Sequence, residues 1–483
     1  MKTFMDPIYP DAEFSQQRLE RLLERHTSDR FTADPKERIL LKGGSILSMD
    51  SHVGDYPVGD VLIEGARIAE IGPSISEAGA TVIDARNRIV MPGFCDPHIH
   101  CWEGALGRII PENVPQLTTN PVAAVHGAPT SSRSYMHAAH QLFGPACRPE
   151  DIYAGTLITL LTALEGGITT VVDNMHNARS PEHSDAGIEA MVAAGGRGVH
   201  AVGSPRYGDW AGQLPRDAFR LRDTFFSSDD SLQTMRLFTT GFDDNTALFA
   251  LRKDLDVWIS FDSGIESQPV EEFYASGWLD GREAINHANF LSSSQRQAVI
   301  DGGGQVNVCP RIETQFRYGE IPYTEWAEQG LRPGLSNDNP MTFGIDMFNE
   351  MRALYLLQRV EEHRGGPKSV SLRGVIESAT QKGADNCGLS SVVGSLTPGK
   401  KADIILLDVG GLPLFPRNNV LSSVVQGAGI GSVDTVLVNG RIRKWAGKLL
   451  GVDMARVQHV VEESHAYLLR TVGWPHDAID FDD

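Results

Sequence analysis

Two distant stretches of the chain alternate apolar and polar residues, a pattern typical of short β-strands with one buried face. Near the N-terminus, residues 39–49 and 60–72 alternate in this way and are punctuated by glycines. Near the C-terminus, residues 402–408 and 433–440 return to the same pattern. We therefore expect both ends of the chain to build one small β-sandwich domain.

The residues between these two regions have a different pattern, in which segments with helical apolar spacing alternate with short strands rich in β-branched residues. Residues 151–165 have helical spacing, Gly166 and Gly167 end that helix, and the strand 168–173 follows. The unit recurs, and the predicted strands end near His100, Asp173, Val202, Thr240, Phe261, His287, Val308 and Leu335. Eight such strands predict an α/β fold, a closed (β/α)8 TIM-like barrel with its functional groups at the C-terminal strand ends.

The predicted organisation has five segments. They are an N-terminal extension (1–37), the N-terminal half of the β-sandwich (38–90), the barrel (91–393), the C-terminal half of the β-sandwich (394–450), and a C-terminal helix and tail (451–483). The connection 102–149 is rich in Pro, Gly, Ser and His, and its length predicts a functional cover or binding loop. The extension (1–37) and the connection 102–149 could both cover the surface of a neighbouring subunit. We therefore expect a homo-oligomer, a dimer or a multiple of one.

Composition narrows the class of protein. The 483 residues are 41% hydrophobic and 22% charged, as in soluble globular proteins. A formal net charge of −19 without Lys/Arg clusters argues against nucleic acid or an anionic membrane as a partner. The five scattered cysteines form no CxxC pair, which favours a reduced, cytoplasmic protein. No stretch has the character of a signal peptide or a membrane span.

The first barrel strand carries a pair of histidines with the spacing of metal ligands. An apolar run, residues 88–91, is broken by Pro92 and Gly93, and an extended alternation then continues to His100. Side chains two residues apart on a strand share a face, so His98 and His100 point the same way. Imidazole pairs of this kind bind Zn and other transition metals. The pair can also be two ordinary strand histidines, but its position at a strand end favours the metal.

Taken together, the motifs resemble the metal-dependent amidohydrolase superfamily. The resemblance rests on PGFCDPHIH at residues 92–100, the strand-end His287, SNDNP at 336–340 and GSLTPGKKADIILLD at 394–408. It covers roughly residues 38–450, and the nearest branch contains the chlorohydrolases, cytosine deaminases and guanine deaminases. The resemblance implies a distorted (β/α)8 barrel with a β-sandwich built from both chain ends.

The resemblance also implies roles for particular residues. Members of this branch hold one divalent metal ion, commonly Zn²⁺ or Fe²⁺, by the HxH pair, a strand-five His and a strand-eight Asp. By position, His98 and His100 would be ligands, Asp338 the strand-eight ligand, and His287 the strand-six His that orients the attacking water or the oxyanion. We expect one divalent ion, Zn²⁺ with Fe²⁺ as the alternative.

Elementary chemistry agrees with these roles. A divalent ion lowers the pKa of a water it binds towards ~7. Asp338 is then suited to take the proton as a catalytic base, and His287 to stabilise developing charge. The alternatives are an ordinary turn aspartate at 338 and a satisfied core histidine at 287. Both residues fall at the end of the appropriate strand, which favours the catalytic interpretation.

Strand five departs from the family pattern. Ser260 occupies the aligned position of the missing ligand, and no histidine lies between His200 and His287 to replace it. Asp262 shares the strand face of Ser260 and can serve as an oxygen ligand, a proton donor or a substrate contact, or be a polar strand end. Glu266 is a further candidate for the acid.

Four other residues are expected near the substrate. Trp102 and Glu103 directly follow the HxH pair, and His176 follows strand two at the barrel mouth. Arg311 follows strand seven and is suited either to hold a substrate carboxylate or carbonyl, or to form a structural ion pair.

We therefore expect a metal-dependent hydrolase of a small cyclic or aromatic compound, acting on a C–N bond as a deaminase or amide hydrolase, or on a related aryl–heteroatom bond. A second hypothesis keeps the fold but assigns a non-hydrolytic reaction, such as lyase, decarboxylase, cyclase or isomerase chemistry, because one ligand is missing. A third is a silent relative that only binds a ligand, which the retained His98, His100, His287 and Asp338 argue against.

Overall fold

The computed structural model describes residues 12–28, 34–110, 135–205, 214, 216–228, 231–239, 246–262 and 270–474. The candidate acid Glu266 and most of the predicted cover, residues 111–134, lie outside the described residues. Within the described residues, no helix is both long enough and apolar enough to cross a membrane.

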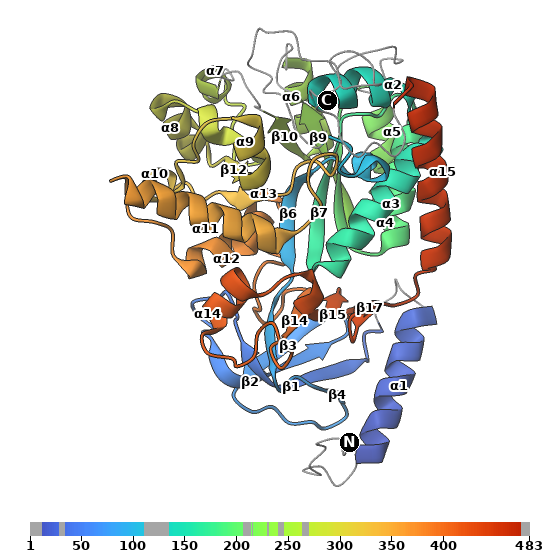
Figure 1. The fold of residues 1–483 in the computed structure, drawn as a ribbon, viewed down its shortest axis with the longest axis vertical. Coiled ribbons are helices and arrows are strands. Elements are labelled where there is room, and N and C mark those ends of the chain that lie inside the picture. The colour runs from blue at the N-terminus through green and yellow to red at the C-terminus, as the bar shows by residue number, and fades with distance from the viewer. Residues whose placement is uncertain are drawn as a thin grey trace, which may run out of the picture.

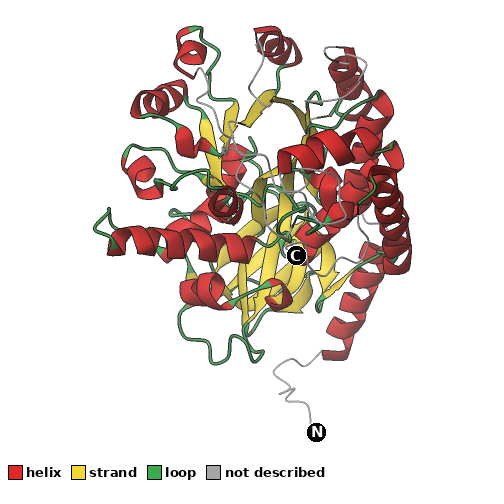
Figure 2. Ribbon diagram, turned by 45° about the horizontal axis from the view of Figure 1, so that its top comes forward, coloured by secondary structure: helices red, strands yellow, loops and turns green. Residues whose placement is uncertain are grey.

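The predicted barrel is present. Its strands are β6 (Phe94–Ile99), β7 (Ile168–Met175), β8 (Arg197–Val202), β9 (Gln233–Thr239), β10 (Trp258–Asp262), β11 (Glu283–Asn286), β12 (Gln305–Val308) and β13 (Gly334–Leu335). They form one eight-stranded sheet in chain order, with every neighbouring pair parallel. Helices surround this sheet (Figure 2). The eight strand positions predicted from the sequence are confirmed, and so is the fold class.

Backbone pairing between the first and last strands closes the barrel. The amide of Asp338 donates to the carbonyl of His98 at 2.9 Å, and the amide of His100 donates to the carbonyl of Asp338 at 2.8 Å. Ile99 and Asp338 thereby form a parallel bridge beyond the end of β13. The residues with the proposed metal ligands are therefore neighbours in one hydrogen-bonded ladder, although the sequence separates them by more than 200 residues.

The two chain ends build a separate sheet, as predicted. Its strands are β1 (Arg38–Ile46), β2 (Tyr56–Glu64), β3 (Arg67–Gly72), β4 (Thr81–Asp84), β5 (Arg88–Pro92), β14 (Ile404–Asp408), β15 (Val433–Val438), β16 (Arg441–Trp445) and β17 (Lys448–Leu449). The nine strands run in the order β17-β16-β15-β14-β5-β1-β2-β3, with β4 beside β1. Antiparallel pairing of β5 with β14 joins the two ends. The exact domain boundaries stay a prediction.

The helices lie mainly outside the barrel strands (Figure 1). They are α1 (Ala12–Ser28), α2 (Gly144–Ala146), α3 (Pro149–Glu165), α4 (Pro181–Ala194), α5 (Arg216–Phe225), α6 (Thr246–Leu255), α7 (Val270–Ala275), α8 (Ser293–Gly302), α9 (Pro310–Phe316), α10 (Tyr323–Glu328), α11 (Met347–His363), α12 (Leu372–Ala379), α13 (Gln381–Asn386), α14 (Val420–Ser422) and α15 (Met454–Val472). The closing helix α15 packs along α3, and α1 packs against β4 and β16 of the second sheet.

The second sheet is fastened to the barrel at a close backbone approach. Gly93 joins β5 to β6, and a Cβ atom there would lie only 2.2 Å from Oγ1 of Thr169, so no larger residue fits. The amide of Gly93 donates to the carbonyl of Asp403 at 3.0 Å. The buried carboxylate of Asp403 accepts from Nε and Nη2 of Arg197 on β8, at 2.9 and 3.0 Å, and from the amide of Asn439 at 2.8 Å. Asp403 therefore links both sheets.

Removing this carboxylate should destabilise the protein strongly. Asp403→Ala removes the carboxylate that forms a buried ion pair with Arg197, so we expect the free energy of unfolding to fall by about 3–5 kcal/mol. Asp84→Ala is the matched control, because the Asp84–Arg86 pair is exposed and such pairs contribute less than about 1 kcal/mol. Urea denaturation of both variants checks this. Equal losses in the two variants would contradict the linking role of Asp403.

Candidate functional site

His98, in β6, and His100, directly after it, are called the β6 histidines below, and their Nε2 atoms both lie near Oδ1 of Asp338. Nδ1 of His100 donates to the backbone carbonyl of Asn174 at 2.8 Å, which leaves Nε2 without a proton and available as a ligand atom. Nδ1 of His98 is held by the side-chain amides of Asn174, at 2.6 Å, and Asn286, at 2.7 Å. Partners of this kind fix the ring orientation of metal-binding histidines. Asn174, near the end of β7, and Asn286, at the end of β11, are not among the residues predicted from the sequence.

Asp338 completes this group from the opposite side of the barrel seam. Its Oδ1 lies 3.2 Å from Nε2 of His98 and 3.4 Å from Nε2 of His100. Burial raises the pKa of Asp338, but His287, His98 and His100 together lower it below its usual value. The residue has a φ of 62°, in the left-handed region that non-glycine residues rarely adopt. Such conformations concentrate at functional sites, where the surrounding structure holds them.

His287, directly after β11, faces the same carboxylate. Its Nε2 lies 3.4 Å from Oδ2 of Asp338, while its Nδ1 donates to Oε1 of Glu313 at 3.1 Å. His287 also has a left-handed backbone, with a φ of 52°. Burial lowers its pKa, but the carboxylates of Asp338, Glu313 and Asp262 outweigh burial and raise it to about 9. The ring is therefore an imidazolium at neutral pH. The sequence analysis did not assign a role to Glu313.

Strand β10 brings Asp262, rather than the aligned Ser260, to this group. The Asp262 carboxylate lies 3.9 Å from Nε2 of His100 and 3.7 Å from Nε2 of His287. The hydroxyl of Ser260, two residues earlier on the same strand face, accepts from Nη1 of Arg236 at 3.1 Å. Of these two β10 residues, the structure thus brings the Asp262 carboxylate next to His100 and His287.

The donor atoms fit one divalent ion. Nε2 of His98 is buried and has no hydrogen bond within the described part of the chain. Donors that each lie about 2.1 Å from one ion in a tetrahedral site are about 3.4 Å apart. The Asp338 contacts to the two β6 histidines, at 3.2 and 3.4 Å, match this spacing, and Asp262 at 3.9 Å is close to it. Cys309 also lies close enough to His98, His287 and Asp338 to share an ion.

A second cluster of buried polar side chains lies beside His100. The His176 ring is 4.1 Å from the His100 ring, and its Nε2 is 3.8 Å from Oε1 of Glu103. That Glu103 oxygen accepts from the hydroxyl of Tyr135 at 2.7 Å. Trp102 meets the His176 ring edge-on at 5.7 Å. Three residues predicted near the substrate therefore come together, and Tyr135 joins them from the predicted cover, where no local pattern marks it.

Burial shapes the charge of this second cluster. It raises the pKa of Glu103 well above its usual value, and the opposing hydrogen bond from Tyr135 does not offset it. Burial likewise lowers the pKa of His176 well below its usual value. Burial thus disfavours the charged forms of both side chains. Oε2 of Glu103 and Nε1 of Trp102 have no hydrogen-bond partner within the described residues.

Arg311 makes structural contacts. Its Nε donates to Oε1 of Glu350 at 2.5 Å, and its Nη2 donates to Oδ1 of Asn337 at 2.8 Å and to the carbonyl of Gly344 at 2.9 Å. Of the two alternatives that the sequence leaves open, these contacts favour the structural ion pair over a substrate contact.

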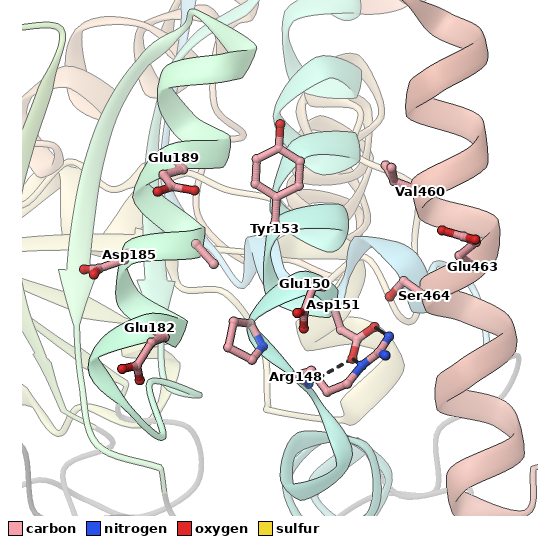
Figure 3. Close-up of a pocket in the computed structure, with 12 residues that line it drawn as sticks. Arg148, Glu150, Asp151, Tyr153, Glu182, Asp185, Glu189, Val460, Glu463 and Ser464 are labelled. Atoms are coloured by element: carbon pink, nitrogen blue, oxygen red, sulfur yellow. Dashed lines mark hydrogen bonds and ion pairs between the residues drawn. The ribbon is translucent and has the colours of Figure 1, made fainter.

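A separate groove on the outside of the barrel does not belong to this site. It lies between α3, α4 and α15 and has a volume of about 640 Å³ (Figure 3). Its walls carry the acidic side chains of Glu150, Glu182, Asp185, Glu189 and Glu463. None of the residues that the sequence singles out lines this groove. The barrel mouth is the candidate active site.

Comparison with known proteins identifies the family. The profile of the amidohydrolase family matches residues 89–243 and 256–443. A 5-methylthioadenosine/S-adenosylhomocysteine deaminase of Symbiobacterium thermophilum is 27% identical over 435 residues, which cover 84% of this chain and 93% of that protein. A 5'-deoxyadenosine deaminase of Methanothermobacter thermautotrophicus is 27% identical over 455 residues, covering 89% and 99%.

Solved structures agree on the fold. An adenosine deaminase from Xanthomonas campestris with bound zinc aligns with a TM-score of 0.75 at 18% identity, covering 91% of this chain and 100% of that one. Atrazine chlorohydrolase from Arthrobacter aurescens, complexed with zinc, aligns with a TM-score of 0.74 at 20% identity, covering 89% and 100%. The predicted enzyme class, an amidohydrolase-type hydrolase, is confirmed. The chain belongs to the amidohydrolase family, as its sequence motifs predict.

Proposed function

We propose that this protein is a metal-dependent deaminase that hydrolyses the C–N bond between an amino group and the ring of a small nitrogen heterocycle, with a nucleoside-like purine derivative as the expected substrate class. The observation that carries the proposal is the convergence of His98, His100, Asp338, His287 and Asp262 at one point of the barrel mouth. The deaminase relatives, which match over most of their length, support the choice of an amino leaving group.

The metal ligands in this proposal are His98, His100 and Asp338, with Asp262 as the fourth protein group. A divalent ion held there, zinc or alternatively iron, supplies the Lewis acidity that makes water nucleophilic at neutral pH. The neighbouring zinc-bound structures support zinc. The two Nδ1 contacts of the β6 histidines keep their Nε2 atoms aimed at this point.

Proton transfer falls to Asp338 and His287. Asp338 is held ionised, so it can take a proton from the attacking water as the oxygen bonds to the ring carbon. The same proton then passes to the amino group, the C–N bond breaks and ammonia leaves. The ring carbon keeps the water oxygen with its second proton, and that proton moves to the adjacent ring nitrogen, so the product has a ring carbonyl and a ring N–H. His287, an imidazolium fixed by Glu313, stabilises the negative charge that develops near the attacked carbon.

Trp102, Glu103 and His176 are proposed to bind the substrate, as the sequence analysis predicts. The carboxyl of Glu103, whose Oε2 has no hydrogen-bond partner within the described residues, can form a hydrogen bond with a ring nitrogen. Trp102 supplies a flat apolar surface with an indole N–H that has no partner in the described part of the chain. Asp262 is the most exposed of the group, with 21% of its side chain accessible, and so is suited to meet an incoming substrate. Arg311 lies beside the site through Asn337 and supports it indirectly.

Ammonia release tests this function. The purified protein should release ammonia in equal amounts with product from at least one member of a panel of adenine nucleosides, guanine, cytosine and aminotriazines. Asp338→Asn keeps the shape of the side chain but removes its basicity, so its rate should fall by more than about a hundredfold. A product of unchanged mass, formed without ammonia by the metal-loaded enzyme, would instead establish the non-hydrolytic alternative.

Strand β10 offers a matched pair of variants. Asp262→Ala should lower both activity and the metal retained after dialysis against a mild chelator, because it removes a carboxylate next to His100 and His287. Ser260→Ala removes only a hydroxyl that accepts from Arg236, so metal retention should stay near that of the unmodified protein. Elemental analysis of metal per chain distinguishes them. If Ser260→Ala lost more metal than Asp262→Ala, Ser260 rather than Asp262 would be the metal ligand on β10.

We also propose that the protein is a cytoplasmic homo-oligomer, a dimer or a multiple of one. Helix α1 supports this, because it packs on the second sheet through α1–β4 and α1–β16 contacts, and much of its remaining surface is exposed in the described part of the chain. Light scattering at micromolar concentration should give at least twice the 52.7 kDa chain mass. A monomeric mass would remove this proposal without affecting the chemistry.

A further inference from the structure

One buried side chain at the barrel mouth has no part in the proposed deamination. Cys309 directly follows β12 and is completely buried. Its backbone amide donates to Oε1 of Glu313 at 2.9 Å, and the same oxygen accepts from Nδ1 of His287 at 3.1 Å. Glu313 therefore fixes both residues, and their remaining donor atoms, Sγ of Cys309 and Nε2 of His287, lie near the carboxylate of Asp338.

Cys309 belongs to a second set of potential metal ligands that overlaps the first. The donor atoms of this set lie within 4.8 Å of one another, and they come from the buried residues His98, His287, Cys309 and Asp338. The Asp338 carboxylate serves both sets, because its Oδ1 lies 3.4 Å from Nε2 of His100 and its Oδ2 lies 3.4 Å from Nε2 of His287. Nε2 of His98 has no hydrogen-bond partner within the described residues, so it is available to either set. Since one imidazole nitrogen binds one ion, the two positions cannot be occupied together.

The two positions differ in chemical character. The position beside His98 and His100 is completed by carboxylate oxygens of Asp338 and Asp262, which suits an ion such as zinc. The second position contains a thiol, and thiolates select soft cations. A sulfur and a nitrogen that bind one zinc ion in a tetrahedral site are about 3.6 Å apart. Donor atoms within 4.8 Å of one another also leave room for a soft cation larger than zinc, such as cadmium.

We propose that Cys309, His98, His287 and Asp338 form a second metal position, which is selective for soft cations and excludes the ion of the proposed active site. Burial raises the pKa of the free Cys309 thiol, and a bound cation removes the proton of a coordinating thiol. That proton and the Nε2 proton of His287 pass to solvent as the two metal–ligand bonds form. A cation held here occupies His287 and Asp338 and so inhibits hydrolysis. The inference rests on the metal site of the proposed function, but not on the reaction catalysed there.

Cadmium titration of the metal-free, full-length protein tests this position. A thiolate bound to Cd²⁺ gives an ultraviolet charge-transfer band, which imidazole and carboxylate ligands do not give. We expect this band to saturate at one equivalent of Cd²⁺ per chain. Cys309→Ser removes the sulfur with little change in shape, so the band should disappear and the Cd²⁺ affinity should fall by about tenfold or more. Cys387→Ser, at a buried cysteine outside both ligand sets, should keep the band.

Anomalous diffraction from crystals of the unmodified protein soaked in Cd²⁺ is a second measurement, which does not depend on how well a variant folds. The cadmium peak should lie within bonding distance of Sγ of Cys309. A peak between His98 and His100 without contact to Cys309 would overturn the proposal. Absence of the band in the unmodified protein would also overturn it, and so would an equal band in Cys309→Ser. Zinc-loaded protein should lose its zinc as the band develops, and retention of both ions would contradict the shared position.

Failure of this position is distinguishable from failure of the proposed function. Ammonia release by a zinc-loaded protein that gives no thiolate band with Cd²⁺ would remove this inference and leave the proposed function standing. A thiolate band in a protein that releases no ammonia from any compound of the panel would remove the proposed function and leave this inference standing.

Discussion

The backbone pairing that closes the barrel is the constraint on which the rest of the site depends. Two backbone hydrogen bonds join Asp338 to His98 and His100. They bring the Asp338 carboxylate beside two imidazole rings and fix the backbone at these three residues. Each side chain is almost completely buried, so their charges interact in a medium of low polarity. Asp338, which forms this pairing, has a left-handed backbone, as does His287 after β11. The geometry of the site is therefore a property of barrel closure.

Much of this could be predicted from the sequence, because the barrel repeats one pattern. Each strand ends where a β-branched run meets a polar residue, and in a parallel barrel these ends must share one face. His98 and His100 follow from the two-residue period of a strand. His287 could be predicted as a site residue because it lies at the end of the predicted sixth strand. Asp338 could be predicted because it lies in the segment that follows the eighth strand. The structure places these four side chains together, and their roles stay a prediction.

The remaining features depend on contacts that the local pattern does not encode. Ser260 and Asp262 share one strand face and lie about 6.6 Å apart. A sequence alignment that is shifted by two residues therefore puts one in the place of the other without changing the face. The structure brings Asp262 to the histidines and pairs Ser260 with Arg236. Tyr135 reaches Glu103 from a long connection whose path has no periodicity to interpret.

Anomalous diffraction at the zinc and iron absorption edges tests whether His98, His100 and Asp338, at the closure of the barrel, hold one metal ion. We expect one metal peak about 2.0–2.2 Å from Nε2 of His98, Nε2 of His100 and a carboxylate oxygen of Asp338. We further expect an oxygen of Asp262 or of a water to complete the coordination. Crystals of active enzyme with no metal peak between these residues, or with the ion bound elsewhere, would contradict this expectation.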